Sequence, residues 1–129
     1  MQDATIAAAG RLLMAILFLL SGLSKLAAPA ATMGYIASAG LPFPVFGYVA
    51  ALGVELGSLL LLAGFHARIA AAILAAFTVA AGLAFHSNFA DQNEMIHFLK
   101  NVALAGGLLQ VVAFGAGSFS LDARRVRIA

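Results

Sequence analysis

The chain has 129 residues, of which 64% are hydrophobic and only 9% are charged, whereas soluble domains contain roughly 25% charged residues. A compact soluble domain of this size cannot hide so much apolar surface, so we expect one integral membrane domain over residues 1–129. The net charge of +2 rests on a short basic tail, which argues against nucleic-acid binding and for contact with membrane lipid. The absence of cysteine excludes disulfides, thiolate metal sites and cysteine-ligated iron–sulfur clusters.

Four apolar runs follow one another along the chain, each near the ~20 residues that cross ~30 Å of hydrocarbon. They predict membrane helices over about 6–28, 45–65, 69–87 and 95–115. A cleaved signal peptide is the alternative interpretation of the first run, but three more membrane-length runs follow it. The sequence therefore predicts an all-α, four-helix membrane bundle.

The segment between the first two runs, residues 29–47, carries all three prolines and no charge. Proline interrupts helices, so we expect a long external loop here. Within it, Met33 and Ile36 favour a short interfacial helix that places Tyr35 at the level of the lipid headgroups.

Basic residues are concentrated at one end of the predicted bundle. The tail after the fourth run contains three arginines, and Arg68 lies in the short second turn, whereas the third loop contains two carboxylates. The positive-inside rule then places both termini in the cytoplasm and residues 86–101, the main polar stretch, on the outer side. Arg11 is expected to anchor the first helix at the cytoplasmic interface.

Small residues recur inside the predicted helices. Gly53 and Gly57 have the GxxxG spacing that allows two membrane helices to approach closely, and Gly106 and Gly107 lie midway along the fourth run. We therefore expect these four glycines to lie where helices pack together.

Five polar residues fall in the outer half of the predicted bundle, and together they predict an outward-facing polar pocket: Lys25, Glu55, His86, Lys100 and Asn101. A carboxylic acid within an apolar run costs at least ~2.5 kcal/mol on insertion, so Glu55 needs a partner or a proton. It is either a ligand-binding or proton-handling group, or half of a structural ion pair with Lys25 or Lys100. Both interpretations remain open.

His86 and His97 are the two histidines of this region, and neutral imidazole suits a haem or metal ligand. No third ligand has a recognisable spacing, so interfacial histidines are favoured and no metal site is predicted. Lys100 and Asn101 can contact a quinone carbonyl or an anion at the start of the fourth helix. Snorkelling of Lys100 and an interhelical hydrogen bond from Asn101 are the favoured alternatives.

Three groups of residues occur together along the chain: Ser21-Gly22 with Lys25, Glu55 with Gly57, and Lys100-Asn101 with Gly106-Gly107. They lie in the segments GRLLMAILFLLSGLSKL, VELGSLLLLAGFHAR, LAFHSNFADQ and FLKNVALAGGLLQ. With these features the chain resembles the DoxX family of small four-helix membrane proteins, in particular its enterobacterial inner-membrane branch. The resemblance implies a multi-pass protein of the bacterial inner (plasma) membrane.

The family takes its name from a small subunit of an archaeal complex that oxidises sulfur compounds and passes electrons to quinone. The resemblance therefore implies a non-autonomous accessory subunit of a quinone-linked redox system, with quinone as candidate ligand and redox-complex subunits as candidate partners. The alternatives are a non-catalytic assembly or stress-response partner and a small transporter or channel, which would need homo-oligomers. The sequence contains no phosphate loop, dinucleotide fingerprint or nucleophile elbow, so an autonomous enzyme is not indicated.

Overall fold

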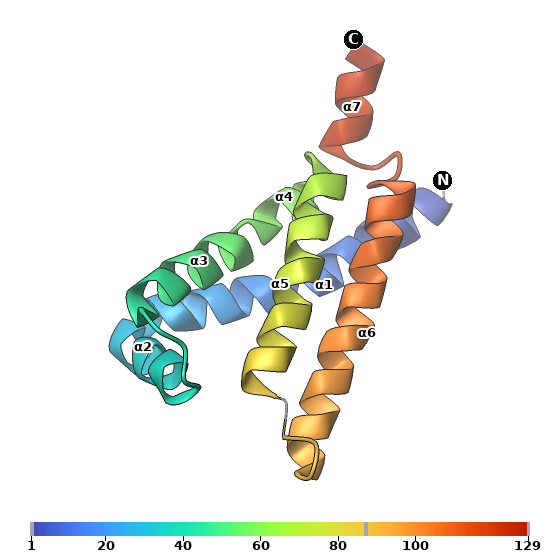
Figure 1. Cartoon of the computed structure of the whole chain (residues 1–129). Coiled ribbons are helices and arrows are strands. Elements are labelled where there is room, and N and C mark those ends of the chain that lie inside the picture. The colour runs from blue at the N-terminus through green and yellow to red at the C-terminus, as the bar shows by residue number, and fades with distance from the viewer. Residues whose placement is uncertain (1, 87, 129) are drawn as a thin grey trace.

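A computed structural model describes residues 2–86 and 88–128, with side chains as far as residue 124. Within this part of the chain the regular elements are all helices (Figure 1): α1 (Gln2–Ala27), α2 (Pro29–Ser38), α3 (Pro44–Leu56), α4 (Ser58–Ala63), α5 (Ala67–Phe85), α6 (Gln92–Phe114) and α7 (Leu121–Ile128). Four spans are long and apolar enough to cross a membrane, namely Gln2–Ala27, Pro44–Ala63, Ala67–Phe85 and Gln92–Phe114. The predicted all-α membrane bundle is confirmed, and each predicted span ends within four residues of the observed one.

Two helix pairs make up the bundle (Figure 1). α5 lies alongside α6, while α1 crosses α3 and α4. The fully buried side chains Leu61, Leu74 and Leu108 meet where α4, α5 and α6 converge, and Phe18 of α1 packs against them. The pairs therefore share a core toward the end that carries the termini.

The second membrane span is broken at Gly57, between α3 and α4. The Gly57 amide donates to the Gly53 carbonyl at 2.9 Å, and a Cβ at Gly57 would lie 3.1 Å from the carbonyl oxygens of Gly53 and Val54. Ser58 compensates for the break, because its hydroxyl donates to the Glu55 carbonyl at 2.6 Å. The GxxxG spacing thus coincides with a local break in this span.

The predicted packing role of the other glycines is found at one position. A Cβ at Gly107 would lie 3.2 Å from the Met14 sulfur on α1, whereas Gly53 and Gly106 have nothing within 4 Å of such a Cβ. In the described part of the chain, therefore, Gly107 alone of the four predicted packing glycines faces another helix.

The proline-rich segment forms a short helix, as the sequence suggested. Pro29 occupies the first turn of α2, where a missing N–H costs no hydrogen bond. Ile36 is 5% exposed and packs against Gly47 of α3, and the Tyr35 ring stacks on Phe85 with centroids 4.9 Å apart. α2 therefore bridges the two helix pairs at the end remote from the chain termini.

The basic tail contains α7, which the sequence did not predict. The Asp122 carboxylate in its first turn accepts hydrogen bonds from the backbone N–H groups of His66 (2.7 Å) and Ala67 (2.9 Å). Its own backbone N–H donates to the Gly64 carbonyl at 2.9 Å. Asp122 thus satisfies donors at the beginning of α5 that the helix leaves unpaired.

Candidate functional site: a polar groove between the helix pairs

Glu55 and Lys25 form an ion pair where α3 crosses α1. The Lys25 Nζ lies 2.8 Å and 3.0 Å from the two Glu55 carboxylate oxygens and 2.9 Å from the Ser21 hydroxyl. Gly22 allows this close crossing, because a Cβ there would lie 3.0 Å from the Leu56 side chain. Of the two lysines that the sequence offered as partners for Glu55, the structure selects Lys25.

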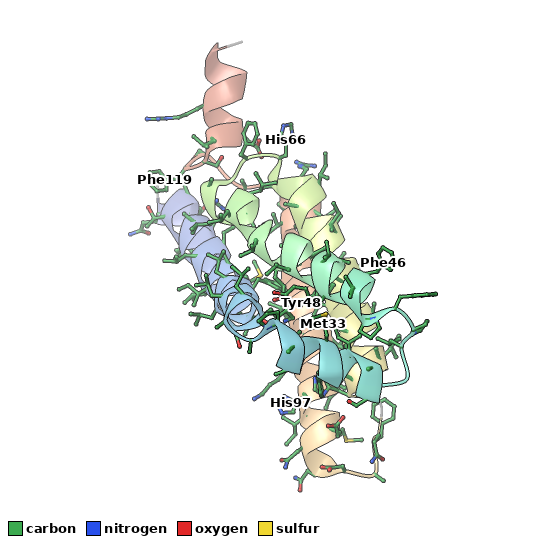
Figure 2. All side chains as sticks on the ribbon, turned by 90° about the vertical axis from the view of Figure 1, so that its left-hand side faces the viewer. Met33, Phe46, Tyr48, His66, His97 and Phe119 are labelled. Carbon is green, nitrogen blue, oxygen red and sulfur yellow. The ribbon has the colours of Figure 1, made fainter. Side chains whose placement is uncertain are left out.

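Tyr48 adds a second tie between the same helices. Its hydroxyl donates to the Lys25 carbonyl at 3.0 Å, in the last turn of α1 where the helix leaves carbonyls unpaired. In Figure 2, Tyr48 lies near the junction of α1 and α2, whereas His66 and Phe119 mark the opposite end of the bundle. The crossing of α1 and α3 is therefore fixed by side-chain bonds from both helices.

A groove of about 910 Å³ opens beside this ion pair, between the α1–α3 pair and the α5–α6 pair. Its walls are largely apolar, and its lining includes four of the five residues predicted to form a pocket: Lys25, Glu55, His86 and Asn101. Lys100 is exposed and does not line the groove. Consecutive residues of an α-helix point about 100° apart, so Lys100 and its neighbour Asn101 do not share a face.

Thr78 lies in the groove wall and was not predicted. Its side chain is 4% exposed, and Oγ1 has no hydrogen-bond partner among the described residues. The Thr78 carbonyl accepts a bond of 3.2 Å from Asn101 Nδ2, and Gly82 leaves room for this amide. A buried, unpaired hydroxyl costs about 1–3 kcal/mol. The sequence signal was available, since Thr78 is the one polar side chain between residues 69 and 85.

His86 and His97 pack against each other near the groove. Their rings stack with centroids 5.0 Å apart and an interplanar angle of 28°, and His86 Nδ1 lies 3.5 Å from a Glu94 carboxylate oxygen. Among residues 2–86 and 88–128, no group of three or more His, Cys, Asp or Glu side chains is arranged to hold a metal ion. The two imidazoles thus join the end of α5 to the first turns of α6.

Arg11 behaves differently from the interfacial anchor that the sequence suggested. Only 3% of the residue is exposed, and the guanidinium donates to the carbonyls of Leu61 (3.0 Å), Leu62 (2.9 Å) and Phe119 (2.6 Å). These bonds tie α1 to the last turn of α4 and to the segment before α7. Gly64 permits the approach, because a Cβ there would collide with the guanidinium.

The sequence of the chain matches a known family of membrane proteins. The family model for DoxX matches residues 6–87, which include Lys25, Glu55 and Thr78. The chain belongs to the DoxX family. Together with the four membrane-length helices, this membership and the relatives described next make it a multi-pass protein of the inner membrane.

Two relatives of the chain come from Escherichia coli (strain K12). Inner membrane protein YqjF is 36% identical over 115 residues, which cover 87% of this chain and 85% of YqjF. Inner membrane protein YphA is 30% identical over 120 residues, which cover 88% of this chain and 86% of YphA. No solved structure matches the chain.

Proposed function

We propose that this DoxX-family protein is a non-autonomous accessory subunit of a quinone-linked membrane redox system, and that the polar groove holds the quinone headgroup. The observation that carries the proposal is Thr78, a residue of the groove wall whose buried hydroxyl has no partner among the described residues. Buried polar groups nearly always have a hydrogen-bond partner, so an unpaired one in a ligand-sized groove favours an absent ligand.

The size and chemistry of the groove suit such a ligand. Its volume of about 910 Å³ falls in the ~300–1,000 Å³ range of small-molecule sites, which are mostly apolar with a few polar groups. A quinone requires an apolar slot for its tail and hydrogen-bond donors for its two carbonyl oxygens. The groove supplies both kinds of surface.

Thr78 and Asn101 are the donors with capacity for a ligand. An amide NH₂ group has two N–H donors, and the Asn101 amide donates one to the Thr78 carbonyl. The three N–H donors of Lys25, by contrast, match its three contacts with Glu55 and Ser21. We therefore assign headgroup binding to the α5–α6 side and a framework role to the ion pair.

Electron transfer is assigned to partner subunits, because the chain contains no cysteine for an iron–sulfur cluster or a redox-active thiol. The second candidate function is a purely non-catalytic assembly partner. The Lys25–Glu55 ion pair favours this second candidate, because its groups are paired within the chain and such a pair can serve only to fix the register of two helices.

Labelling with a photoreactive ubiquinone analogue in native membranes separates the two candidates. We expect label on groove-lining peptides of α5 and α6. Thr78→Val should lower labelling about 5-fold, the equivalent of one hydrogen bond of ~1 kcal/mol. The matched control is Thr32→Val, because Thr32 also lines the groove but its hydroxyl donates to the Ala28 carbonyl at 2.9 Å. Equal labelling of both variants, or label outside the groove, favours the assembly partner.

A further inference from the structure

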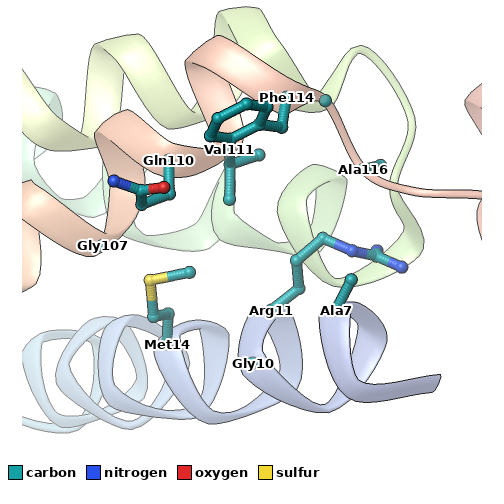
Figure 3. A pocket seen from close by; sticks show the side chains of 10 residues that line it. Ala7, Gly10, Arg11, Met14, Gly107, Gln110, Val111, Phe114 and Ala116 are labelled. Atoms are coloured by element: carbon teal, nitrogen blue, oxygen red, sulfur yellow. The ribbon is translucent and has the colours of Figure 1, made fainter. Parts of the chain in front are cut away.

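A second, smaller slot lies at the other end of the bundle, between α1 and α6 (Figure 3). Its volume is about 310 Å³. Figure 3 shows Met14 pointing from α1 toward α6 and Arg11 reaching toward Ala116, just beyond the end of α6. Gln110 provides the other polar side chain of the lining, and the remaining residues are apolar or glycine.

Arg11 brings a buried positive charge to this slot. Arg11 lies within the electrostatic field of the Asp122 carboxylate, which also accepts backbone N–H groups of α5. Its Nε is buried and lacks a hydrogen-bond partner. Three carbonyl acceptors and the Asp122 carboxylate stabilise the guanidinium, but the buried Nε donor without a partner remains costly.

Arg68 places a second guanidinium at the same end of α6. A Cβ at Gly115 would lie 3.2 Å from Arg68 Nε and 3.3 Å from its Nη2, so this side chain lies directly over Gly115. Gly115 itself lines the slot. Two arginines from different helices therefore flank one end of an otherwise mostly apolar slot.

We propose that this slot binds an anionic phospholipid, with the phosphate beside Arg11 and Arg68 and an acyl chain along Met14 and Gly107. Guanidinium groups match phosphate oxygens in geometry and charge, and basic pockets between membrane helices bind anionic headgroups. The phosphate brings an acceptor to the end of the slot at which the Arg11 Nε has no partner among the described residues. The lipid is independent of the ligand in the polar groove.

Adjacent glycines provide a matched pair of variants for the test. Gly107→Leu directs a side chain against Met14 and fills the slot, whereas Gly106→Leu extends a side chain of equal size into open space. Arg68→Gln removes the exposed cation and leaves the three hydrogen bonds of Arg11 in place. Native mass spectrometry of detergent-purified protein, exchanged with phosphatidylglycerol or phosphatidylcholine, counts the lipids that each variant retains.

We expect the wild type and Gly106→Leu to retain one phosphatidylglycerol in preference to phosphatidylcholine. Gly107→Leu should lose retention at least about 5-fold, and Arg68→Gln should lose most of the preference for the anionic lipid. Equal retention of the two lipids, or unchanged retention in Gly107→Leu, overturns the proposal. Raised thermal stability with inorganic phosphate alone, without lipid retention, also overturns it and indicates a free-anion site. Thr78→Val must leave lipid retention unchanged, which separates this test from that of the quinone groove.

Discussion

Lys25 and Arg11 lie on the same helix, α1, about 21 Å apart along its axis at 1.5 Å per residue. The protein accommodates their charges in different ways. Lys25 keeps 21% of its side chain exposed and meets the Glu55 carboxylate at 2.8 Å. Arg11 is 3% exposed and meets three backbone carbonyls instead. The two ends of the bundle are therefore stabilised differently: one has an ion pair beside an open groove, and the other has a buried cation that holds chain segments together.

The difference predicts that Arg11 contributes more to stability than any other side chain of α1. Arg11→Met leaves carbonyls of Leu61, Leu62 and Phe119 without their donor, so we expect a loss of about 3–5 kcal/mol in the free energy of unfolding. Denaturant titration in mild detergent measures it. Arg68→Met is the control at an exposed arginine and should change stability by less than about 1 kcal/mol. Similar losses in both variants contradict the distinction between them.

For the ion pair, we expect the double substitution to lower the free energy of unfolding less than the single substitution Glu55→Leu does. Glu55→Leu leaves Lys25 without its carboxylate and should cost about 2–3 kcal/mol, less than a fully buried pair because Lys25 is partly exposed. Adding Lys25→Met should restore most of that loss, since apolar replacement of an ion pair is often neutral. A double variant that is less stable than Glu55→Leu contradicts this expectation and shows that Lys25 has a stabilising partner besides Glu55 and Ser21.

Asp122 caps the beginning of α5 at the same end of the bundle as Arg11. Asp122→Ala removes two hydrogen bonds to the beginning of α5 and should cost about 1–2 kcal/mol. Asp91 is the comparison, because it caps α6 through a single bond to the Asn93 N–H at 2.9 Å. Asp91→Ala should therefore cost about half as much in the same titration. A larger loss at Asp91 is the contrary outcome.

Thr78 gives a small effect of the opposite sign. In ligand-free protein Thr78→Val replaces an unpaired buried hydroxyl by a methyl group, so we expect a gain of about 1 kcal/mol in stability. Thr32→Val loses a hydrogen bond to the Ala28 carbonyl and should not stabilise. Loss of stability in Thr78→Val indicates that the hydroxyl has a partner within the protein.

The spans and the ion pair could be predicted from the sequence because each follows from one dominant cost. Hydrocarbon requires apolar stretches of fixed length, and an acid within such a stretch requires a partner at the same depth. Lys25 met that condition from the end of the first run, and Glu55 met it from within the second. Lys100 lies at a suitable depth in the sequence, but its side chain does not point toward Glu55, because the neighbouring Asn101 occupies the helix face toward Thr78.

The clamp around Arg11 could not be predicted, because its partners are backbone carbonyls. Any residue supplies a carbonyl, so the sequence does not mark Leu61 or Phe119 as acceptors. The approach also depends on the left-handed turn at Gly64 (φ 71°), which brings α4 and the segment before α7 together. Similarly, α7 is recognisable only once Asp122 is seen to reach the first turn of α5.

The quinone content of purified protein tests most directly whether the groove at the Lys25 end is a ligand site. Ala81→Phe places a ring in the groove, and Ala72→Phe places the same ring on the exposed face of α5. Extraction and chromatography should find quinone in the wild type and in Ala72→Phe, and at least about 10-fold less in a folded Ala81→Phe protein. Equal quinone content in the two variants would contradict the assignment of the groove.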